Sequence, residues 1–221
     1  MKTLVIAPHP DDETLGPGGT LLRRQAEGAE VAWVIVTGLS VESGWSAEMV
    51  ASRAAEIRRV TDLYHFSAVY ELGFPTTRLD QVPMADLVRV ISSVFTEFEP
   101  EEVFVPHPSD VHSDHRIVFR AVAACTKWFR YPSVKRVLAY ETLSETDFVL
   151  GTRMPFQPNV FVNIGGYVEQ KLSILDVYKS ELGKFPFPRS HEAVRALATL
   201  RGATAGYESA EGFELLRERL S

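Results

Sequence analysis

Short apolar runs alternate with amphipathic runs up to about residue 140, and this alternation constrains the fold more than any other feature. Patterns typical of buried strands occur at residues 4–7, 31–36, 68–72, 103–105 and 137–140. Apolar residues at helical spacing occur between them, at residues 18–27, 47–64, 84–98 and 116–129. Parallel strands are buried on both faces, and their connections are usually helices. The order therefore predicts an α/β fold, with a mostly parallel sheet covered by helices on both faces.

The pattern is looser from about residue 150 to residue 221. Two prolines indicate a loop at residues 154–159, and residues 160–164 could form an edge strand. Helices are expected at residues 167–178, at residues 191–204 and near residues 212–219. No repeat or linker divides the chain, and 221 residues are typical of one domain. We therefore expect a single domain, residues 1–221, whose looser last part shapes a binding pocket.

Composition excludes several classes of protein. Hydrophobic residues make up 45% and charged residues 24%, which excludes disordered, collagen-like and coiled-coil chains. The net charge of -6 argues against a nucleic-acid partner, because such proteins carry a basic surplus. Cys125 is the only cysteine, so no internal disulfide can form. The first apolar run is too short for a signal peptide, and no run is long enough for a membrane span, so we expect a cytoplasmic protein.

The turn after the first strand does not fit a dinucleotide site. A Gly-x-Gly-x-x-Gly motif is absent there, and the string Gly16-Pro17-Gly18-Gly19 has a different spacing. Pro17 also lacks the N–H that a phosphate would need. We therefore exclude a dinucleotide cofactor.

The first chemical cluster follows the first strand and reads His9-Pro10-Asp11-Asp12-Glu13. Ligands of open α/β sheets bind beyond the carboxyl ends of the strands. Three adjacent carboxylates repel one another, so a cation or several N–H donors should compensate them. A single acid here could simply cap a helix. An imidazole together with three carboxylates favours a cation site.

The second cluster follows the strand at residues 103–105 and spans residues 106–115. Three of the six histidines lie here, His107, His112 and His115, interleaved with Asp110 and Asp114. Imidazole and carboxylate groups are zinc ligands, and a site with an open position is catalytic. Two histidines and one carboxylate also suit iron(II). Spacing alone leaves His107 and Asp110 in competition with His112 and His115 as ligands.

The two motifs together resemble the PIG-L/LmbE-like family of zinc-dependent N-deacetylases, which act on N-acetylglucosamine conjugates. The resemblance is carried by PHPDDE after the first strand and by HSDH about a hundred residues later, and it extends over most of the chain. It implies a Rossmann-like sheet, in agreement with the alternating pattern. It also implies a small N-acetylated sugar conjugate as the substrate.

The family pattern implies a role for each residue that matches it. His9, Asp12 and His115 resemble the metal ligands, with Zn²⁺ as the implied cofactor and Fe²⁺ as an alternative. Asp11 resembles the general base. His112 resembles the partner histidine that stabilises the oxyanion or donates a proton, and Asp114 the carboxylate that orients His112. Two further residues, Arg53 and Tyr140, are candidates for contact with the substrate, although each could equally have a structural role.

Three questions stay open on the sequence. His107 and Asp110 have no role in the family pattern, and a turn is an equally good explanation for them. The apolar loop at residues 185–187 could be a lid or a contact between copies in a homo-oligomer. A hydrolase of another bond, or a sugar-binding module without activity, remains an alternative to a deacetylase.

Overall fold

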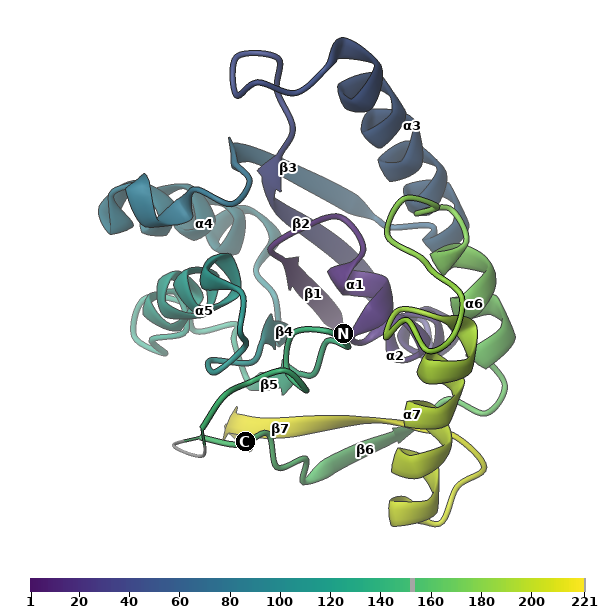
Figure 1. Ribbon diagram of the computed structural model, residues 1–221. Helices are drawn as coiled ribbons and strands as arrows, with labels where there is room; N and C mark the ends of the chain where they lie inside the picture. The colour runs from purple at the N-terminus through teal and green to yellow at the C-terminus, as the bar shows by residue number, and fades with distance from the viewer. Residues whose placement is uncertain (152–153, 221) are drawn as a thin grey trace.

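The computed structural model describes residues 1–151 and 154–220, and its strands form one seven-stranded sheet in the order β3-β2-β1-β4-β5-β7-β6 (Figure 1). Five strands are parallel: β1 (Lys2–Ala7), β2 (Glu30–Gly38), β3 (Ala68–Pro75), β4 (Glu102–Pro106) and β5 (Arg136–Tyr140). Two antiparallel strands extend the sheet beyond β5: β7 (Ala210–Glu218) and the edge strand β6 (Val160–Asn163). The predicted mostly parallel α/β fold is confirmed.

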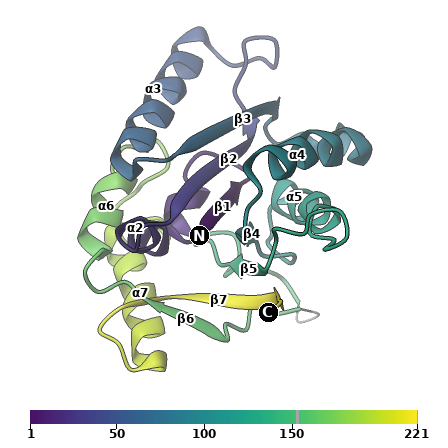
Figure 2. The same cartoon turned by 180° about the vertical axis from the view of Figure 1, so that it is seen from behind.

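Helices cover both faces of the sheet (Figure 2). One face carries α4 (Met84–Phe98) and α5 (Ser113–Ala124). The other carries α2 (Gly18–Ala26), α3 (Ala47–Tyr64), α6 (Val168–Leu175) and α7 (His191–Ala205). Successive side chains of a strand point to opposite faces. In β1, Leu4 and Ile6 pack in the core on the side of α4 and α5, and Val5 and Ala7 pack in the core on the other side. This double burial explains the continuous apolar runs.

Two short helices lie beside the strand ends. The four-residue α1 (Asp12–Leu15) follows β1, and the 3₁₀ helix η1 (Leu79–Gln81) follows β3. Neither is long enough to show a periodic apolar pattern, so the sequence does not predict them. Within the described residues, no helix combines the length and the apolar character that crossing a membrane requires.

The prediction of a helix near residues 212–219 is wrong, because these residues belong to β7. Glu, Leu and Arg are good helix formers, which makes the segment look helical in isolation. In the structure the segment pairs with both β5 and β6, and its first residues, Ala210 to Phe213, are buried. Backbone pairing with two strands and burial of the apolar residues override the local preference.

Two charged side chains from the last third of the chain hold α1 and α2 in place. The Glu211 carboxylate on β7 accepts the first N–H groups of α2, from Gly19 at 2.8 Å and Thr20 at 2.7 Å. The Lys171 ammonium on α6 donates to Glu211 Oε1 at 2.7 Å and to the carbonyl oxygen of Leu15 at 3.0 Å. All of these groups are buried. The segment that follows β1 is therefore fixed from the opposite end of the chain.

The close approach at α2 requires glycine and gives a first prediction. A Cβ built on Gly19 would lie 2.9 Å from three side-chain atoms of Ile164, whereas one built on Gly166 would meet nothing within 4 Å. We expect Gly19→Ala to lower the free energy of unfolding by about 1–3 kcal/mol, the usual cost of overpacking. Urea denaturation of Gly19→Ala and of the control Gly166→Ala measures this difference. Equal stability of the two variants would contradict it.

Candidate metal centre and active site

The two chemical clusters meet where the strand order reverses. β1 and β4 are neighbours, yet β1 continues to β2 on one side and β4 to β5 on the other. Ligands of doubly wound sheets bind at such a switch point, beyond the carboxyl ends of the strands. His9 follows β1 and His115 lies on α5 after β4, and their ring centroids are 5.4 Å apart. Stretches about a hundred residues apart in the chain therefore share one site.

His9, Asp12 and His115 form a group that could hold a metal ion. Asp12 Oδ2 lies 3.5 Å from His9 Nδ1 and 3.3 Å from His115 Nε2. One ligand atom from each residue lies within 4.8 Å of the other two. Two imidazoles and a carboxylate are a donor set that suits Zn²⁺ or Fe²⁺. The three residues therefore fit a divalent metal ion.

A second group of suitable donors is His9, His112 and Asp114. Here both carboxylate oxygens accept backbone N–H groups, whereas Asp12 accepts one, from His9 at 2.9 Å; Asp114 Oδ2 accepts the N–H of Thr77 at 2.8 Å. Asp114 Oδ1 accepts the N–H of Leu79 at 3.3 Å, and His9 Nε2 lies 3.1 Å from Asp114 Oδ2. These contacts make Asp114 a carboxylate that orients His9 and the loop after β3. The first group is the better metal site.

Asp110 acquires a role that the sequence left open. Its Oδ2 lies 2.8 Å from His115 Nδ1, and its Oδ1 accepts the Thr146 hydroxyl at 2.7 Å. A proton on Nδ1 donates to this carboxylate and leaves His115 Nε2 free to coordinate, which is the arrangement that commonly supports metal-bound histidines. His107 lies elsewhere: its Nδ1 accepts the Ser109 N–H at 3.3 Å, and its ring packs against Phe156.

Buried carboxyl groups dominate the site. Five carboxylates are at most 3% exposed: Asp11, Asp12, Glu13, Asp110 and Asp114. Burial opposes the charged imidazole, yet hydrogen bonds to Asp114 and Asp12 raise the pKa of His9 to about 9. Burial likewise opposes charge on His115, but Asp12 and Asp110 raise the pKa of His115 to about 10. Without a metal, the carboxylates thus hold protons on both histidines, as expected of a site that attracts cations.

Asp11 and Asp12 are adjacent but have separate surroundings. Asp12 faces the two histidines, whereas Asp11 lines the cavity described below. Asp11 has φ of 131°, a strained value for a residue with a side chain, and its N–H donates to Glu13 Oε2 at 3.0 Å. The other oxygen of Glu13, Oε1, accepts the Tyr178 hydroxyl at 2.9 Å, and this second hydrogen bond fixes the position of the Glu13 carboxylate. The strained turn therefore separates a metal-facing carboxylate from a cavity-facing one.

Arg189 is the partner of the cavity-facing carboxylate. Its guanidinium donates to Asp11 Oδ2 at 2.9 Å, and it also lies 3.2 Å from Glu145 Oε1 and 3.3 Å from Glu181 Oε2. Burial and the neighbouring Asp12 charge raise the pKa of Asp11 well above its ordinary value, and Arg189 opposes that rise. From the sequence, Arg189 could reach an anionic part of a substrate, but a solvated helix start is the favoured interpretation. Its pairing with Asp11, 178 residues away in the chain, is not predicted.

His112 lies at the N-cap of α5 with one ring nitrogen engaged. Its Nδ1 accepts the backbone N–H of Asp114 at 3.1 Å, so the ring proton of the neutral form is on Nε2. Burial and the neighbouring His9 lower the pKa of His112 to about 4. The Asp114 carboxylate bonds to His9 and to backbone groups, so the backbone of Asp114 rather than its carboxylate sets the orientation of His112.

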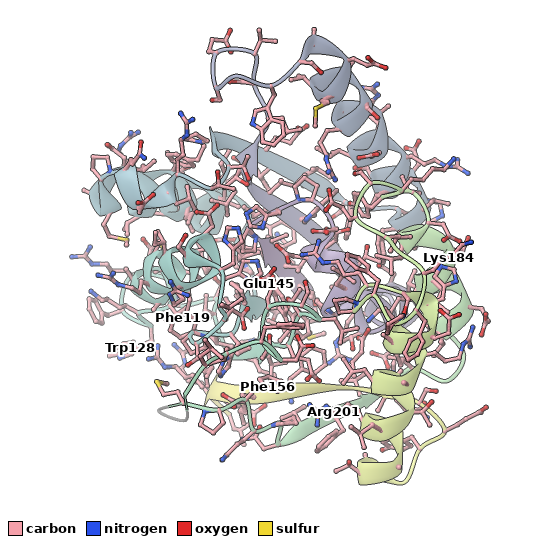
Figure 3. All side chains as sticks on the ribbon, viewed as in Figure 1. Phe119, Trp128, Glu145, Phe156, Lys184 and Arg201 are labelled. Atoms are coloured by element: carbon pink, nitrogen blue, oxygen red, sulfur yellow. The ribbon has the colours of Figure 1, made fainter. Side chains whose placement is uncertain are left out.

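A cavity of about 460 Å³ opens beside Asp11 and His112. The helix α3 and the loops after β1, β2 and β3 line it, together with Glu145, Glu181 and Arg189. Figure 3 shows Glu145 near the centre of the molecule, beside the strand ends. Arg53 lines this cavity, as does Trp45, which the sequence did not single out as a site residue. Its size is that of a small-molecule site.

Tyr140 lies outside this cavity. It is fully buried, its hydroxyl donates to the Ile6 carbonyl oxygen at 2.9 Å, and its ring packs against Gly16. The end of β5 therefore places Tyr140 in the core, where it supports the β1 backbone. Of the two candidates for contact with a substrate, only Arg53 faces the cavity.

Residues 4–126 match the PIG-L family, described as GlcNAc-PI de-N-acetylase. The chain belongs to the PIG-L family. The matched region covers more than half of the chain and contains both chemical clusters. The PIG-L family resemblance expected from the sequence is thereby confirmed.

Several relatives of this PIG-L protein are named deacetylases. It is 24% identical to diacetylchitobiose deacetylase of Thermococcus kodakarensis, over 97% of this chain and 83% of that protein. It is 25% identical to a probable N-acetyl-α-D-glucosaminyl L-malate deacetylase of Bacillus cereus, over 80% of this chain and 82% of that protein. The structure of N,N'-diacetylchitobiose deacetylase from Pyrococcus horikoshii superposes with a TM-score of 0.77 at 25% identity, covering 98% and 84% of the two chains.

Proposed function

We propose that the protein is a metal-dependent N-deacetylase that hydrolyses the acetamide of an N-acetylglucosamine-type conjugate. The observation that carries this proposal is the position of Asp11, a buried carboxylate that lines the cavity next to a complete set of metal ligands. A proton acceptor beside a metal centre is what amide hydrolysis requires. Membership of the PIG-L family and the names of its relatives support the same substrate class.

His9, Asp12 and His115 would hold the metal, Zn²⁺ or Fe²⁺. A divalent ion at this position supplies Lewis acidity, which polarises the acetyl carbonyl and makes the attacking water more acidic. Asp110 and Asp114 orient His115 and His9 through the imidazole nitrogens given above. The buried carboxylates make an adjacent cation favourable, because they otherwise repel one another.

Asp11 acts as the general base and carries one proton through the reaction. It accepts a proton from water as the water oxygen bonds to the acetyl carbon. It then gives that proton to the sugar nitrogen as the C–N bond breaks, so that acetate and a free amine are released. Arg189 holds the Asp11 carboxylate in the cavity at 2.9 Å. Positioned proton transfer of this kind contributes about 10²–10⁴-fold to the rate.

His112 stabilises the oxyanion that forms on the acetyl oxygen. The hydrogen bond to Nδ1 leaves Nε2–H as a fixed donor on a cavity-lining side chain. Donors that are fixed before the reaction stabilise developing charge without reorganisation. Arg53 is left to contact the remainder of the substrate from α3.

Acetate release tests the proposed function. Purified protein is incubated with diacetylchitobiose, and acetate and free amine are measured before chelation, after chelation, and after return of Zn²⁺ or Fe²⁺. We expect equal amounts of the two products, loss of both on chelation, and recovery with one of the metals. Hydrolysis that survives complete metal removal would contradict the metal site. Absence of amine release from metal-loaded protein, across N-acetylglucosamine conjugates, would contradict the deacetylase.

Asp110 provides a prediction for the metal site itself. Asp110→Asn replaces the acceptor of the His115 Nδ1 proton, so the imidazole loses its orientation and part of its basicity. We expect the affinity for Zn²⁺ to fall by about 10–100-fold, the usual effect of removing such a partner. Competition with a chromogenic chelator measures it. The control Glu145→Gln changes a nearby buried acid that pairs with Arg189 instead, and an equal loss of affinity there would contradict the assignment.

A further inference from the structure

The cavity has one apolar wall and one charged wall. The apolar side chains come from β2, the loop that follows it, and α3, and they are Ile35, Leu39, Trp45, Met49, Val50, Ala54 and Ile57. The charged side chains are Asp11, Arg53, Glu71, Glu145, Glu181 and Arg189. His9, which belongs to the metal-ligand group, and His112 also line the cavity. A substrate with its acetamide at Asp11 therefore extends its remainder between these walls.

Both arginines of the cavity are already paired with carboxylates. Arg53 lies 2.5 Å from Glu181 Oε1 and 3.3 Å from Glu56 Oε2. Arg189 lies close to Asp11, Glu145 and Glu181, at the distances given above. Glu181 bridges the two arginines, with one carboxylate oxygen on each.

Acids outnumber bases on the charged wall, with four carboxylates against two guanidiniums. Among the described residues, Glu71 has no ion-pair partner within 4.0 Å, and its side chain is exposed to solvent. Other cations are neighbours of lining residues in the chain but do not belong to the lining: Arg58 follows Ile57, Arg78 follows Thr77, and Lys179 precedes Ser180. Within the lining, an anion would therefore meet two guanidiniums that carboxylates already pair, and more carboxylates than cations.

We propose that this cavity selects conjugates whose second group is uncharged, and that Glu181 is the residue that determines this selection; the proposal rests on the deacetylase function argued above. An anionic group would have to displace a carboxylate from Arg53 or Arg189, or lose its hydration without compensation. A neutral sugar ring needs only hydrogen bonds and an apolar surface. Trp45 and Met49 supply the apolar surface, on the wall opposite the charged side chains.

A pair of disaccharides that differ in one charge tests this proposal. One is diacetylchitobiose, and the other carries glucuronic acid in place of the second ring. We expect metal-loaded wild-type protein to favour diacetylchitobiose in kcat/KM by at least about tenfold, given the energies of close charge pairs. In Glu181→Gln, the guanidiniums of Arg53 and Arg189 each lose one carboxylate partner. The ratio of kcat/KM for diacetylchitobiose to kcat/KM for the uronate should then fall by about tenfold, mainly because the uronate is hydrolysed faster.

Glu56→Gln is the matched control. It also removes a carboxylate from Arg53, but Glu56 lies outside the cavity lining and does not contact Arg189, so the preference should stay near the wild-type value. A wild-type preference for the uronate, or an unchanged preference in Glu181→Gln, would overturn the proposal. A matching change in Glu56→Gln would overturn the role of Glu181.

Failure of the proposed function gives a different result from failure of charge selection. If neither disaccharide releases amine, the same two compounds are titrated calorimetrically into the metal-loaded wild-type protein. Tighter binding of diacetylchitobiose then supports charge selection although the deacetylase has failed. Equal or tighter binding of the uronate, or binding of neither compound, overturns charge selection.

Discussion

Asp11→Asn is expected to lower kcat by about 10²–10⁴-fold while the protein keeps its metal. Asparagine has nearly the same shape as aspartate, but its amide cannot accept the proton of the attacking water. The three metal ligands are unchanged, since Asp11 faces the cavity and Asp12 faces the histidines. Acetate release and elemental analysis of the same preparation measure the two properties together.

Glu71→Gln is the control for this substitution. Glu71 also lines the cavity and also loses one negative charge on substitution, but it has no place in the proton transfer. Its kcat should stay within a few fold of the wild-type value. Full activity of Asp11→Asn would rule out Asp11 as the base. Loss of the metal from Asp11→Asn would instead make Asp11 a ligand.

His115→Ala is expected to remove the metal and with it nearly all activity. The substitution deletes one of three protein ligands and leaves the carboxylates of Asp12 and Asp110 buried without the imidazole between them. Two protein ligands rarely retain zinc against dialysis, because catalytic sites use three. We expect the metal content to fall from about one ion per chain to near zero, and the midpoint of thermal unfolding to fall as well.

His107→Ala is the matched control for the metal loss. His107 lies on the same segment and is buried to the same extent, at 1% exposed, but its ring packs against Phe156 away from the cluster. It should retain the metal. Retention by His115→Ala together with loss from His107→Ala would reverse the assignment. Loss of the metal from His112→Ala would favour the alternative ligand group of His9, His112 and Asp114.

The predictable part of the fold is the part in which local pattern and tertiary environment agree. Strands buried on both faces must be apolar throughout, and helices such as α3 and α4 carry one apolar face, so their positions follow from periodicity. The bounds of these two helices agree with the prediction. β7 could not be predicted in this way, because its pairing with β5 and β6 depends on residues 47 or more positions away.

The candidate site likewise has a part that the sequence predicts and a part that depends on the tertiary structure. Two local motifs located the site, and the family resemblance implied His9, Asp12 and His115 as its ligands. The parallel sheet explains why those motifs meet. Arg189 and Glu181 belong to no motif, and they enter the cavity only because the segment after α6 folds back over the strand ends. Asp110 was visible in the sequence, but only the 2.8 Å contact with His115 distinguishes its role from that of a turn residue.

Lys171 and Glu211 anchor α1 and α2, so the backbone of the metal-ligand group is held separately from the segment that forms one wall of the cavity. Residues 180–189, which supply Glu181 and Arg189, lie between these two anchors along the chain. Exchange of that segment around a retained Arg189, which holds Asp11, would therefore alter the cavity wall while the backbone that carries Asp12 keeps its supports. Exchange of this loop alone is therefore a way to change which substrate fits the cavity. A chain shortened to residues 4–126 would keep both motifs but lose Lys171 and Glu211, which hold α1 and α2 in place.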